Sequence, residues 1–433
     1  MPAPARQLTF DLLGRIESRR LHSDDAVNSP EMARLDPRDR NLTTELVYGV
    51  LRHRATLDWL IKAHSSRPWQ ATEAGARIVL RMALYQFWKM DRIPDHALVN
   101  DAVELAKRRI GPGVAGYVNG VLRRLARLRP WDKDGWLAGA PEHVALSLPP
   151  WLWTRWRKRF GGRRAREFAL SLLSPPPVAF RCDGASGGEA PSFAGFRESE
   201  VVPGAYLPDG AGEGAPPPDA YFQDEASQLI PFLGGAPPAG GAVWDACAAP
   251  GGKAAILAGI AGAGTVLVAS DLDLRRAGRL REVLRRARAG CAVAPTVAVA
   301  DARETPPFRA LFDLVCADVP CSGLGTLRRN PEIKWRIQPE DLGALHETQR
   351  RILQSVAGAV RPGGRLLYST CSTEPEENER VVEGFLREHG GFRVEAPVQP
   401  AGVGLWTGDD GMVRTFPGTR PWDGFFAALL VKV

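Results

Sequence analysis

The chain has 433 residues, of which 44% are hydrophobic and 24% are charged, and its net charge is +7. This length exceeds what one compact core usually serves, so the sequence predicts a multidomain protein. The composition is typical of a soluble protein, and the N-terminal stretch has no apolar run of signal-peptide or membrane length, so we expect a cytoplasmic protein and no membrane association.

The positive charge is concentrated in the first third of the chain. Residues 1–130 hold 22 basic and 14 acidic residues, a net charge of +8, while the remainder has a net charge of −1. Such asymmetry indicates a polyanionic partner. A merely soluble basic domain explains the charge alone equally well.

Residues 1–130 carry apolar residues at helical spacing, which predicts an all-α domain. The pattern is strong in LTTELVYGVLRHRATLDWLI (42–61) and ARIVLRMALYQFWKM (76–90). It continues in HALVNDAVELAKRR and in AGYVNGVLRRLARLRP, where Pro130 is a stop signal.

Residues 151–168, WLWTRWRKRFGGRRAREF, interleave aromatic and basic side chains. Guanidinium groups bind phosphates and aromatic rings stack on unpaired bases, so this stretch is a candidate RNA contact. The alternative is an amphipathic helix whose aromatic residues face the core. The basic residues are Arg155, Arg157, Lys158, Arg159, Arg163, Arg164 and Arg166.

A Pro/Gly-rich stretch at 203–218 is typical of a loop or linker. Beyond it, short apolar runs alternate with helical stretches, which predicts βα units and a mainly parallel sheet. The expected strands are 242–247, 265–271, 296–301, 313–318 and 364–370, with a closing strand in GFFAALLVKV.

The segment DACAAPGGKAAILA (245–258) is a strand end, a glycine turn and a helix start. Gly251 and Gly252 allow a ligand to approach the backbone, and the helix start favours an anionic group. Asp271 ends the next strand, 20 residues after Gly251, where an acid commonly binds ribose hydroxyls. Asp301 ends the third strand and could read an adenine amino group. Fingerprints for nicotinamide cofactors and nucleoside triphosphates are absent, which favours S-adenosylmethionine.

Two thiols are expected at neighbouring strand ends. Asp318 and Cys321 follow the fourth strand, and Cys371 ends the fifth, in LLYSTCS. We expect both thiols in one cleft, with the bases of the loop 328–336 lowering a thiol pKa. A methyl donor and a thiolate suit methylation of pyrimidine carbon 5, because thiolate addition at carbon 6 activates that carbon. Asp318 could hold a proton at N3 of the ring. These residues alone do not rank Cys371 above Cys321.

None of the six cysteines forms a C-x-x-C pair and there are seven histidines, so we expect no metal site and free thiols. Cys182, Cys291 and Cys316 are interpreted as packing residues.

Three motifs, DACAAPGGKA, DVPCSGLGTLRRNPEIKW and LLYSTCSTEPEENE, resemble the signatures of the NOL/NOP/Sun family of RNA cytosine-5 methyltransferases, and YFQDEASQL (221–229) also matches that family. ELVYGVLRHR and YVNGVLRRL resemble the NusB family of helical RNA-binding domains. The resemblance implies a Rossmann-like catalytic domain and formation of 5-methylcytosine in 16S rRNA. One departure is Asp183, which stands where the family usually has asparagine.

The resemblance also assigns the site residues. It makes Cys371 the nucleophile, and Cys321 resembles the cysteine that helps release the product. Cofactor contacts carry over onto Cys247, Ala248, Ala249, Pro250, Gly251, Gly252, Lys253, Asp271, Asp301 and Asp318.

The sequence therefore predicts a NusB-like helical domain at 1–130, a small α+β RNA-binding region at 144–218 and a catalytic domain at 219–433. The expected partner of this monomer is 16S rRNA or a small-subunit assembly particle. Two alternatives stay open, namely the same chemistry on tRNA and a non-catalytic RNA-binding assembly factor.

Overall fold

A computed structural model describes residues 4–90, 93–128, 135, 137–182, 192–210, 214–287, 293–308, 311–397, 407–416, 420 and 422–433. The chain divides into two compact units. Unit 1 comprises Met1–Pro175 together with Leu327–Ile337, and unit 2 comprises Pro176–Thr326 together with Gln338–Val433. The short segment Leu327–Ile337 thus belongs to unit 1, although both of its neighbours along the chain belong to unit 2.

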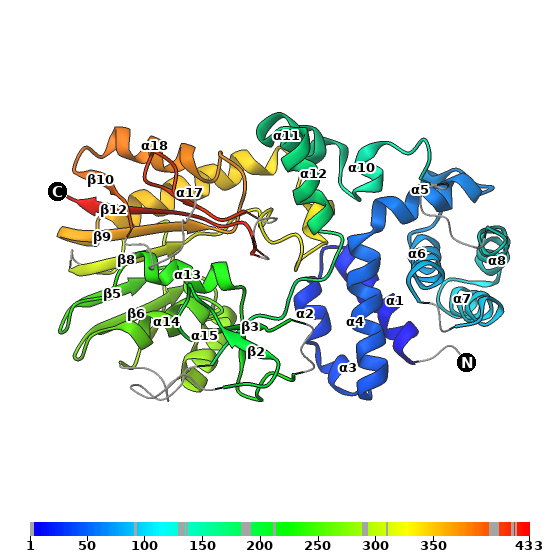
Figure 1. The fold of residues 1–433 in the computed structure, drawn as a ribbon, viewed down its shortest axis with the longest axis horizontal. Helices are drawn as coiled ribbons and strands as arrows, with labels where there is room; N and C mark the ends of the chain where they lie inside the picture. Colours follow the sequence, from blue (N-terminus) through cyan, green and yellow to red (C-terminus); the bar gives the residue numbers. More distant parts are fainter. Residues whose placement is uncertain are drawn as a thin grey trace. The chain divides into compact units, whose positions relative to one another are not determined.

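Unit 1 is helical throughout the part that the structure describes, and its first helices are drawn in blue and cyan in Figure 1. Its helices are α1 (Pro4–Glu17), α2 (Ser23–Val27), α3 (Pro30–Ala33), α4 (Pro37–Arg52), α5 (Arg54–His64), η1 (Trp69–Ala71), α6 (Ala74–Lys89), α7 (Asp95–Arg109), α8 (Pro112–Ala126), α10 (Glu142–Ala145), α11 (Pro150–Phe160), α12 (Gly162–Ser171) and α16 (Ile333–Arg336). The predicted all-α character is confirmed.

Local signals explain the helix ends. The Asp36 side chain accepts a hydrogen bond from the Asp39 amide, and Pro37 fills the first helical position of α4. The expected helix over 42–61 is divided at His53, which ends α4 and begins α5. The predicted boundary at Pro130 lies outside the described residues.

Unit 2 begins with a small antiparallel sheet in the order β2-β3-β1-β4. Its strands are short, and one of them, β3, lies within the stretch 203–218 that was predicted to be a loop or linker. They are β1 (Phe180–Arg181), β2 (Phe196–Glu198), β3 (Ala205–Pro208) and β4 (Tyr221–Phe222). Residues 144–175 of the predicted middle region belong to unit 1, and residues 176–218 belong to unit 2.

The main sheet has the order β10-β12-β9-β8-β5-β6-β7, with β11 paired to β12. Strands β5 to β9 are parallel, and β10, β11 and β12 are antiparallel additions. The expected strands are confirmed, although β9 begins earlier than predicted. The strands are β5 (Ala242–Asp245), β6 (Val266–Asp271), β7 (Thr296–Val299), β8 (Phe312–Asp318), β9 (Val360–Thr370), β10 (Phe392–Glu395), β11 (Val413–Arg414) and β12 (Phe426–Lys432).

Alternate side chains of the central strands point to opposite faces of this sheet. Trp244, Val315 and Leu366 pack with α17 (Asp341–Ala357) and α18 (Glu379–Glu388). The opposite face, which includes Val243, Leu314 and Leu367, packs with α13 (Glu225–Leu233) and α14 (Gly252–Ile260). Figure 1 shows α17 and α18 above the strands and α13 and α14 in front of the sheet below them.

The chain runs from β5 outward to β6 and β7 and then returns to place β8 on the other side of β5. The connections on either side of β5 therefore diverge at its carboxyl end, between β5 and β8. Open α/β sheets bind their ligands at this topological switch point.

Candidate active site

The turn after β5 brings the backbone close to the helix α15 (Leu274–Ala287). Gly251 has a φ of +124°, and a Cβ there would lie 3.1 Å from side-chain atoms of Leu280 and Val283. A larger residue would therefore strain this turn. Helix α14 starts at Gly252, so its unpaired amides face the carboxyl edge of the sheet. The Ala249–Pro250 peptide bond within the turn is cis.

Asp245, the last residue of β5, is 1% exposed. Its Oδ1 atom has no hydrogen-bond partner among the described residues. Burial, and then the nearby Asp318 carboxylate, raise the pKa of Asp245 to about 7. A buried carboxylate oxygen without a hydrogen-bond donor favours a cationic ligand. The site thus fits S-adenosylmethionine, which carries a positive sulfonium and an ammonium group.

Asp271 and Asp301, the residues predicted to bind the ribose and the adenine of the cofactor, lie at or just after the ends of the next two strands. Asp271 ends β6, where its Oδ2 accepts a 3.3 Å hydrogen bond from the Ala249 amide and lies 3.3 Å from the Arg276 guanidinium. Asp301 follows β7 and accepts a hydrogen bond of 2.7 Å from Arg303. This hydrogen bond is the largest influence on Asp301 and lowers its pKa. Both carboxylates stay at the sheet edge that carries the glycine turn.

Asp318, the last residue of β8, is fixed by two side chains. Its Oδ2 accepts a 2.7 Å hydrogen bond from Nζ of Lys253, and its Oδ1 accepts a 2.8 Å hydrogen bond from Ser369. Burial is the largest single influence and would lower the pKa of Lys253, but Asp318, Cys371 and Asp245 together outweigh it, so the pKa is raised. The ammonium of Lys253 also interacts electrostatically with Cys371. The cofactor turn and the thiol site are therefore connected through one charged pair.

The two predicted thiols meet. The Sγ atoms of Cys321 and Cys371 lie 3.2 Å apart. Cys371 follows the last residue of β9, and Cys321 lies in the loop after β8. Parallel pairing of β8 and β9 places Asp318 opposite Ser369, which brings the two loops together.

Close backbone contact holds the Cys321 loop against the Cys371 loop. The Gly325 amide donates a 2.9 Å hydrogen bond to the Cys371 carbonyl, and the Gly424 amide donates to the Gly325 carbonyl. A Cβ at Gly325 would lie 1.8 Å from the Gly424 carbonyl oxygen. Only glycine fits this approach.

The expectation that nearby bases lower a thiol pKa is wrong for Cys321. Its hydrogen bond to Cys371 and then burial raise the pKa of this thiol, and the Glu377 and Asp318 carboxylates add to the effect. Two of the expected bases are used inside unit 1. Lys334 donates to the Arg52 and Ser147 carbonyls, and Arg336 donates to the Ile16 carbonyl.

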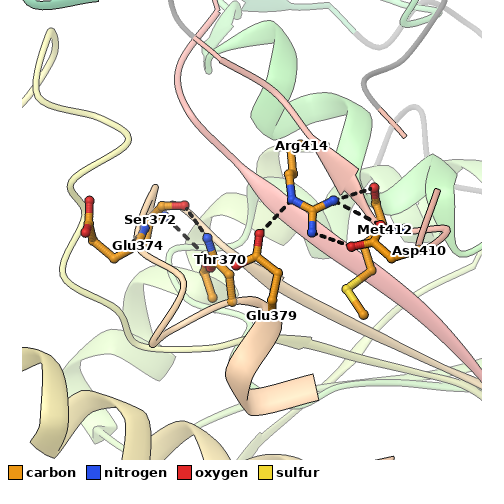
Figure 2. Close-up of polar contacts among 8 residues, drawn as sticks. Thr370, Ser372, Glu374, Glu379, Asp410, Met412 and Arg414 are labelled. Atoms are coloured by element: carbon orange, nitrogen blue, oxygen red, sulfur yellow. Dashed lines mark hydrogen bonds and ion pairs between the residues drawn. The ribbon is translucent and has the colours of Figure 1, made fainter. Parts of the chain in front are cut away.

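Figure 2 shows polar contacts of Thr370 and Ser372, the chain neighbours of Cys371, and of Arg414. The Ser372 amide donates to Oγ1 of Thr370, and the Glu374 amide donates to Oγ of Ser372. Arg414 donates 2.7 Å hydrogen bonds to Glu379 and to Asp410, which ties the start of α18 to β11. The loop that carries the thiol is therefore held at the end of β9 by Thr370, and the Arg414 contacts separately hold the start of α18.

The remaining thiols vary in burial. Cys316 is buried within β8, and Cys247 and Cys182 are half-buried. Burial, and then the Asp245 carboxylate, raise the pKa of Cys247. Cys291 lies outside the described residues, as does Asp183. Cys247 therefore stays a cofactor-contact prediction rather than a reactive thiol.

The aromatic residues of 151–168 divide between core and surface. Trp153, Trp156 and Phe168 are buried, and the rings of Trp156 and Phe168 stack with centroids 4.2 Å apart. The amphipathic-helix interpretation is therefore correct for these three rings. The exposed side carries an open depression of about 390 Å³. Its lining residues are Thr154, Arg157, Lys158 and Gly162.

Sequence reasoning missed Asp245 and Ser369 as parts of the site. Asp245 stands directly before the glycine turn in DACAAPGGKA, and a carboxylate at the end of the first strand was a usable signal. Ser369 was visible in the polar cluster at the end of β9, but its contact with Asp318 depends on strand pairing. Among the residues that the structure describes, no group of three or more His, Cys, Asp or Glu could hold a metal ion. None of the described helices has the length and apolarity needed to cross a membrane.

Comparisons with known proteins match both parts of the chain. A family model described as 16S rRNA methyltransferase RsmB/F matches residues 235–431, and the NusB family model matches residues 3–127. The protein named probable ribosomal RNA small subunit methyltransferase B of Bacillus subtilis is 30% identical over 453 residues, covering 99% of this chain and 98% of that protein.

A second relative is more similar over a slightly shorter stretch. Ribosomal RNA small subunit methyltransferase B of Thermus thermophilus is 35% identical over 406 residues, covering 92% of this chain and 89% of that protein. Among solved structures, the crystal structure of PH0851 matches with a TM-score of 0.76 at 24% identity, covering 100% of both chains. This last likeness supports the fold across both units.

Proposed function

Because this chain belongs to the RsmB/F family of 16S rRNA methyltransferases, we propose that it methylates carbon 5 of a cytosine in 16S rRNA, with S-adenosylmethionine as cofactor. The observation that carries the proposal is the pair of thiols 3.2 Å apart, beside a carboxylate fixed by a lysine. Carbon 5 of cytosine is a poor nucleophile, and a thiolate is the group that activates it.

Cys371 is the nucleophile in this proposal. Its thiolate forms a bond to carbon 6 of the ring, and the electrons of the 5,6 double bond move toward N3, so that carbon 5 becomes the nucleophilic carbon of an enamine. Asp318, which accepts hydrogen bonds from Lys253 and Ser369, passes a proton to N3 as this charge develops and takes it back when the ring is released. Its orientation is fixed before the ring arrives, which is how positioned groups lower a barrier.

Cys321 acts in release. After methylation, carbon 5 still carries its proton, and a base must remove it. The electron pair of that C–H bond re-forms the 5,6 double bond, and the bond between carbon 6 and Sγ of Cys371 breaks. Sγ of Cys321 lies 3.2 Å from Sγ of Cys371, so a Cys321 thiolate is placed to accept this proton.

S-adenosylmethionine supplies the activated methyl group when it is bound. The residues that would hold it lie along the carboxyl edge of β5, β6, β7 and β8. The Oδ1 atom of Asp245, which has no hydrogen-bond partner among the described residues, adds a cation-binding group to the predicted set. That set is Cys247, Ala248, Ala249, Pro250, Gly251, Gly252, Lys253, Asp271, Asp301 and Asp318.

The basic residues supply the RNA-binding side of the proposal. Residues 1–130 carry a net charge of +8, and α11 and α12 expose further basic side chains. Phosphate contacts of this kind give affinity without sequence specificity. We infer that the partner is 16S rRNA or a small-subunit assembly particle, bound by a cytoplasmic monomer.

The test is to incubate the purified protein and S-adenosylmethionine with unmodified 16S rRNA and, in parallel, with a tRNA pool. Mass spectrometry of the digested RNA locates 5-methylcytosine. One methylated cytosine in 16S rRNA, absent with Cys371→Ala, is the expected result. Methylation of tRNA alone would overturn the substrate, and methylation of another atom would overturn the chemistry.

A further inference from the structure

A serine follows each of the two site cysteines, and both serines reach the same carboxylate. Ser322 and Ser372 each donate a hydroxyl hydrogen bond to Oε2 of Glu377. Their two Oγ atoms lie 3.2 Å apart. Glu377, which precedes α18, is 0% exposed. One buried carboxylate therefore joins the loop of Cys321 to the loop of Cys371.

The other oxygen of this carboxylate is equally engaged. Oε1 of Glu377 accepts a 2.7 Å hydrogen bond from the Ser322 amide and a 3.0 Å hydrogen bond from Nε2 of Gln349. The same Gln349 nitrogen donates to the Pro320 carbonyl. The residues before and after Cys321 are thus both held by α17 and Glu377.

All four groups that face the Glu377 carboxylate are donors, which suits an acceptor-only carboxylate ion. Charge-assisted hydrogen bonds of this kind are stronger than neutral ones. On the Cys371 side, the Ser372 carbonyl accepts from Asn378, whose side chain also accepts from Thr370. The backbone on both sides of each cysteine is therefore fixed.

We propose that Glu377 is a positioning residue whose carboxylate sets the spacing of the Cys321 and Cys371 thiols. The proposal rests on the proposed function for the roles of the two cysteines, and it concerns the geometry that both roles require. Attack by one thiol and proton removal by the other act on adjacent ring atoms, so a shift of either loop by about 1 Å would cost about a hundredfold in rate.

The first test needs neither RNA nor cofactor. Diamide oxidises two neighbouring thiols to a disulfide and is itself reduced to the hydrazine, and peptide mass spectrometry measures how fast Cys321 and Cys371 become joined. We expect Glu377→Ala to slow this reaction severalfold. Glu377→Gln should recover most of the rate, because one amide oxygen still accepts from the two nitrogen donors. Glu376→Ala, which removes a carboxylate paired with Arg380, is the matched control and should leave the rate unchanged.

The second test measures methylation. Glu377→Ala should lower kcat about a hundredfold with little change in the KM for RNA, and Glu377→Gln should restore much of kcat. An oxidation rate in Glu377→Ala equal to that of the wild type would overturn the proposal. If Glu377→Ala does not fold, Ser322→Ala is tested in its place, and an oxidation rate equal to that of the wild type would likewise overturn the proposal. A protein that oxidises as expected but does not methylate RNA would overturn the proposed function while leaving the positioning role intact.

Discussion

Nζ of Lys253 donates a 2.7 Å hydrogen bond to Oδ2 of Asp318, which joins the turn after β5 to the end of β8. The two residues stand on either side of the switch point of the sheet, where the cofactor and the target base would have to meet. The same ammonium partly opposes the rise in the pKa of Asp245, so its positive charge acts on two carboxylates.

Replacement of this ammonium should therefore disable the reaction. Lys253→Met leaves Asp318 with Ser369 as its remaining hydrogen-bond donor, and we expect kcat for methylation to fall about a hundredfold at saturating cofactor. Lys432→Met removes a lysine that donates to the Val360 carbonyl, outside this site, and serves as the control. Equal rates for Lys253→Met and the control would remove the pair from the mechanism.

Cofactor binding should depend on pH through Asp245. In the ligand-free protein, burial and then Asp318 raise the pKa of Asp245 to about 7. A cationic cofactor favours the ionised carboxylate, so binding releases a proton, and affinity falls as pH decreases below about 7. Calorimetry in two buffers of different ionisation enthalpy measures the released proton. Asp245→Asn should bind more weakly at pH 8 and lose the pH dependence; an unaltered pH profile would contradict this role.

Replacing Cys371 and replacing Cys321 should block different steps of the reaction. Cys371→Ala should lower methylation at least about a thousandfold while cofactor binding is retained, since the thiol lies beyond the glycine turn. Cys321→Ala should let a covalent RNA–protein adduct accumulate, because proton removal from carbon 5 is lost. The adduct is measured as a slow band on a denaturing gel. Cys182→Ala is the control and should show neither effect. A Cys321→Ala protein with full turnover and no band would assign release to another base.

The exposed basic side of α11 and α12 should contribute to RNA affinity through phosphates. Arg157→Ala combined with Lys158→Ala should weaken RNA binding and reduce the slope of log K against log salt by about 2. Arg285→Ala combined with Arg286→Ala removes two exposed arginines paired with Glu282, and this control should change the slope less. Filter binding across a salt series measures both. If the salt slope of the Arg157→Ala/Lys158→Ala protein equals that of the wild type, these two side chains do not contact RNA phosphates.

Lys334 should make stability depend on pH. This side chain is 1% exposed, and burial lowers its pKa well below the usual value. The folded protein thus holds the proton less tightly than the unfolded chain, so the free energy of unfolding should rise as pH increases toward about 10.4. Lys334→Met loses two hydrogen bonds, and its free energy of unfolding should change less with pH. Urea denaturation at pH 7 and pH 9.5 compares the two proteins, and parallel profiles would refute the assignment.

The sequence predicted the strands, the glycine turn and the two cysteines because each depends on local patterns. Apolar runs and the Gly251–Gly252 pair mark βα units wherever they occur. The pairing of Cys321 with Cys371 followed from parallel strands, whose carboxyl ends share one edge. These features needed no knowledge of distant contacts.

The parts that the sequence did not predict depend on residues far apart in the chain. Lys334 and Arg336 were expected to serve the thiols, yet they donate to carbonyls of residues about 190 to 320 positions away. Glu377 belongs to the LLYSTCSTEPEENE motif, but its contacts depend on the packing of α17 against the loops after β8 and β9. Charge and motif spacing alone do not encode such partners.

The placement of Leu327–Ile337 within unit 1 has a consequence for biosynthesis. Glu332 accepts hydrogen bonds from the amide and hydroxyl of Ser23, and Trp335 donates to the Leu51 carbonyl. These partners are made on the ribosome long before residue 337 emerges. At about 5–20 residues per second, the first helices wait on the order of ten seconds or more for the segment that completes them. The helical unit can therefore be completed only after β5 to β8, half of the strands of the main sheet, have been synthesised.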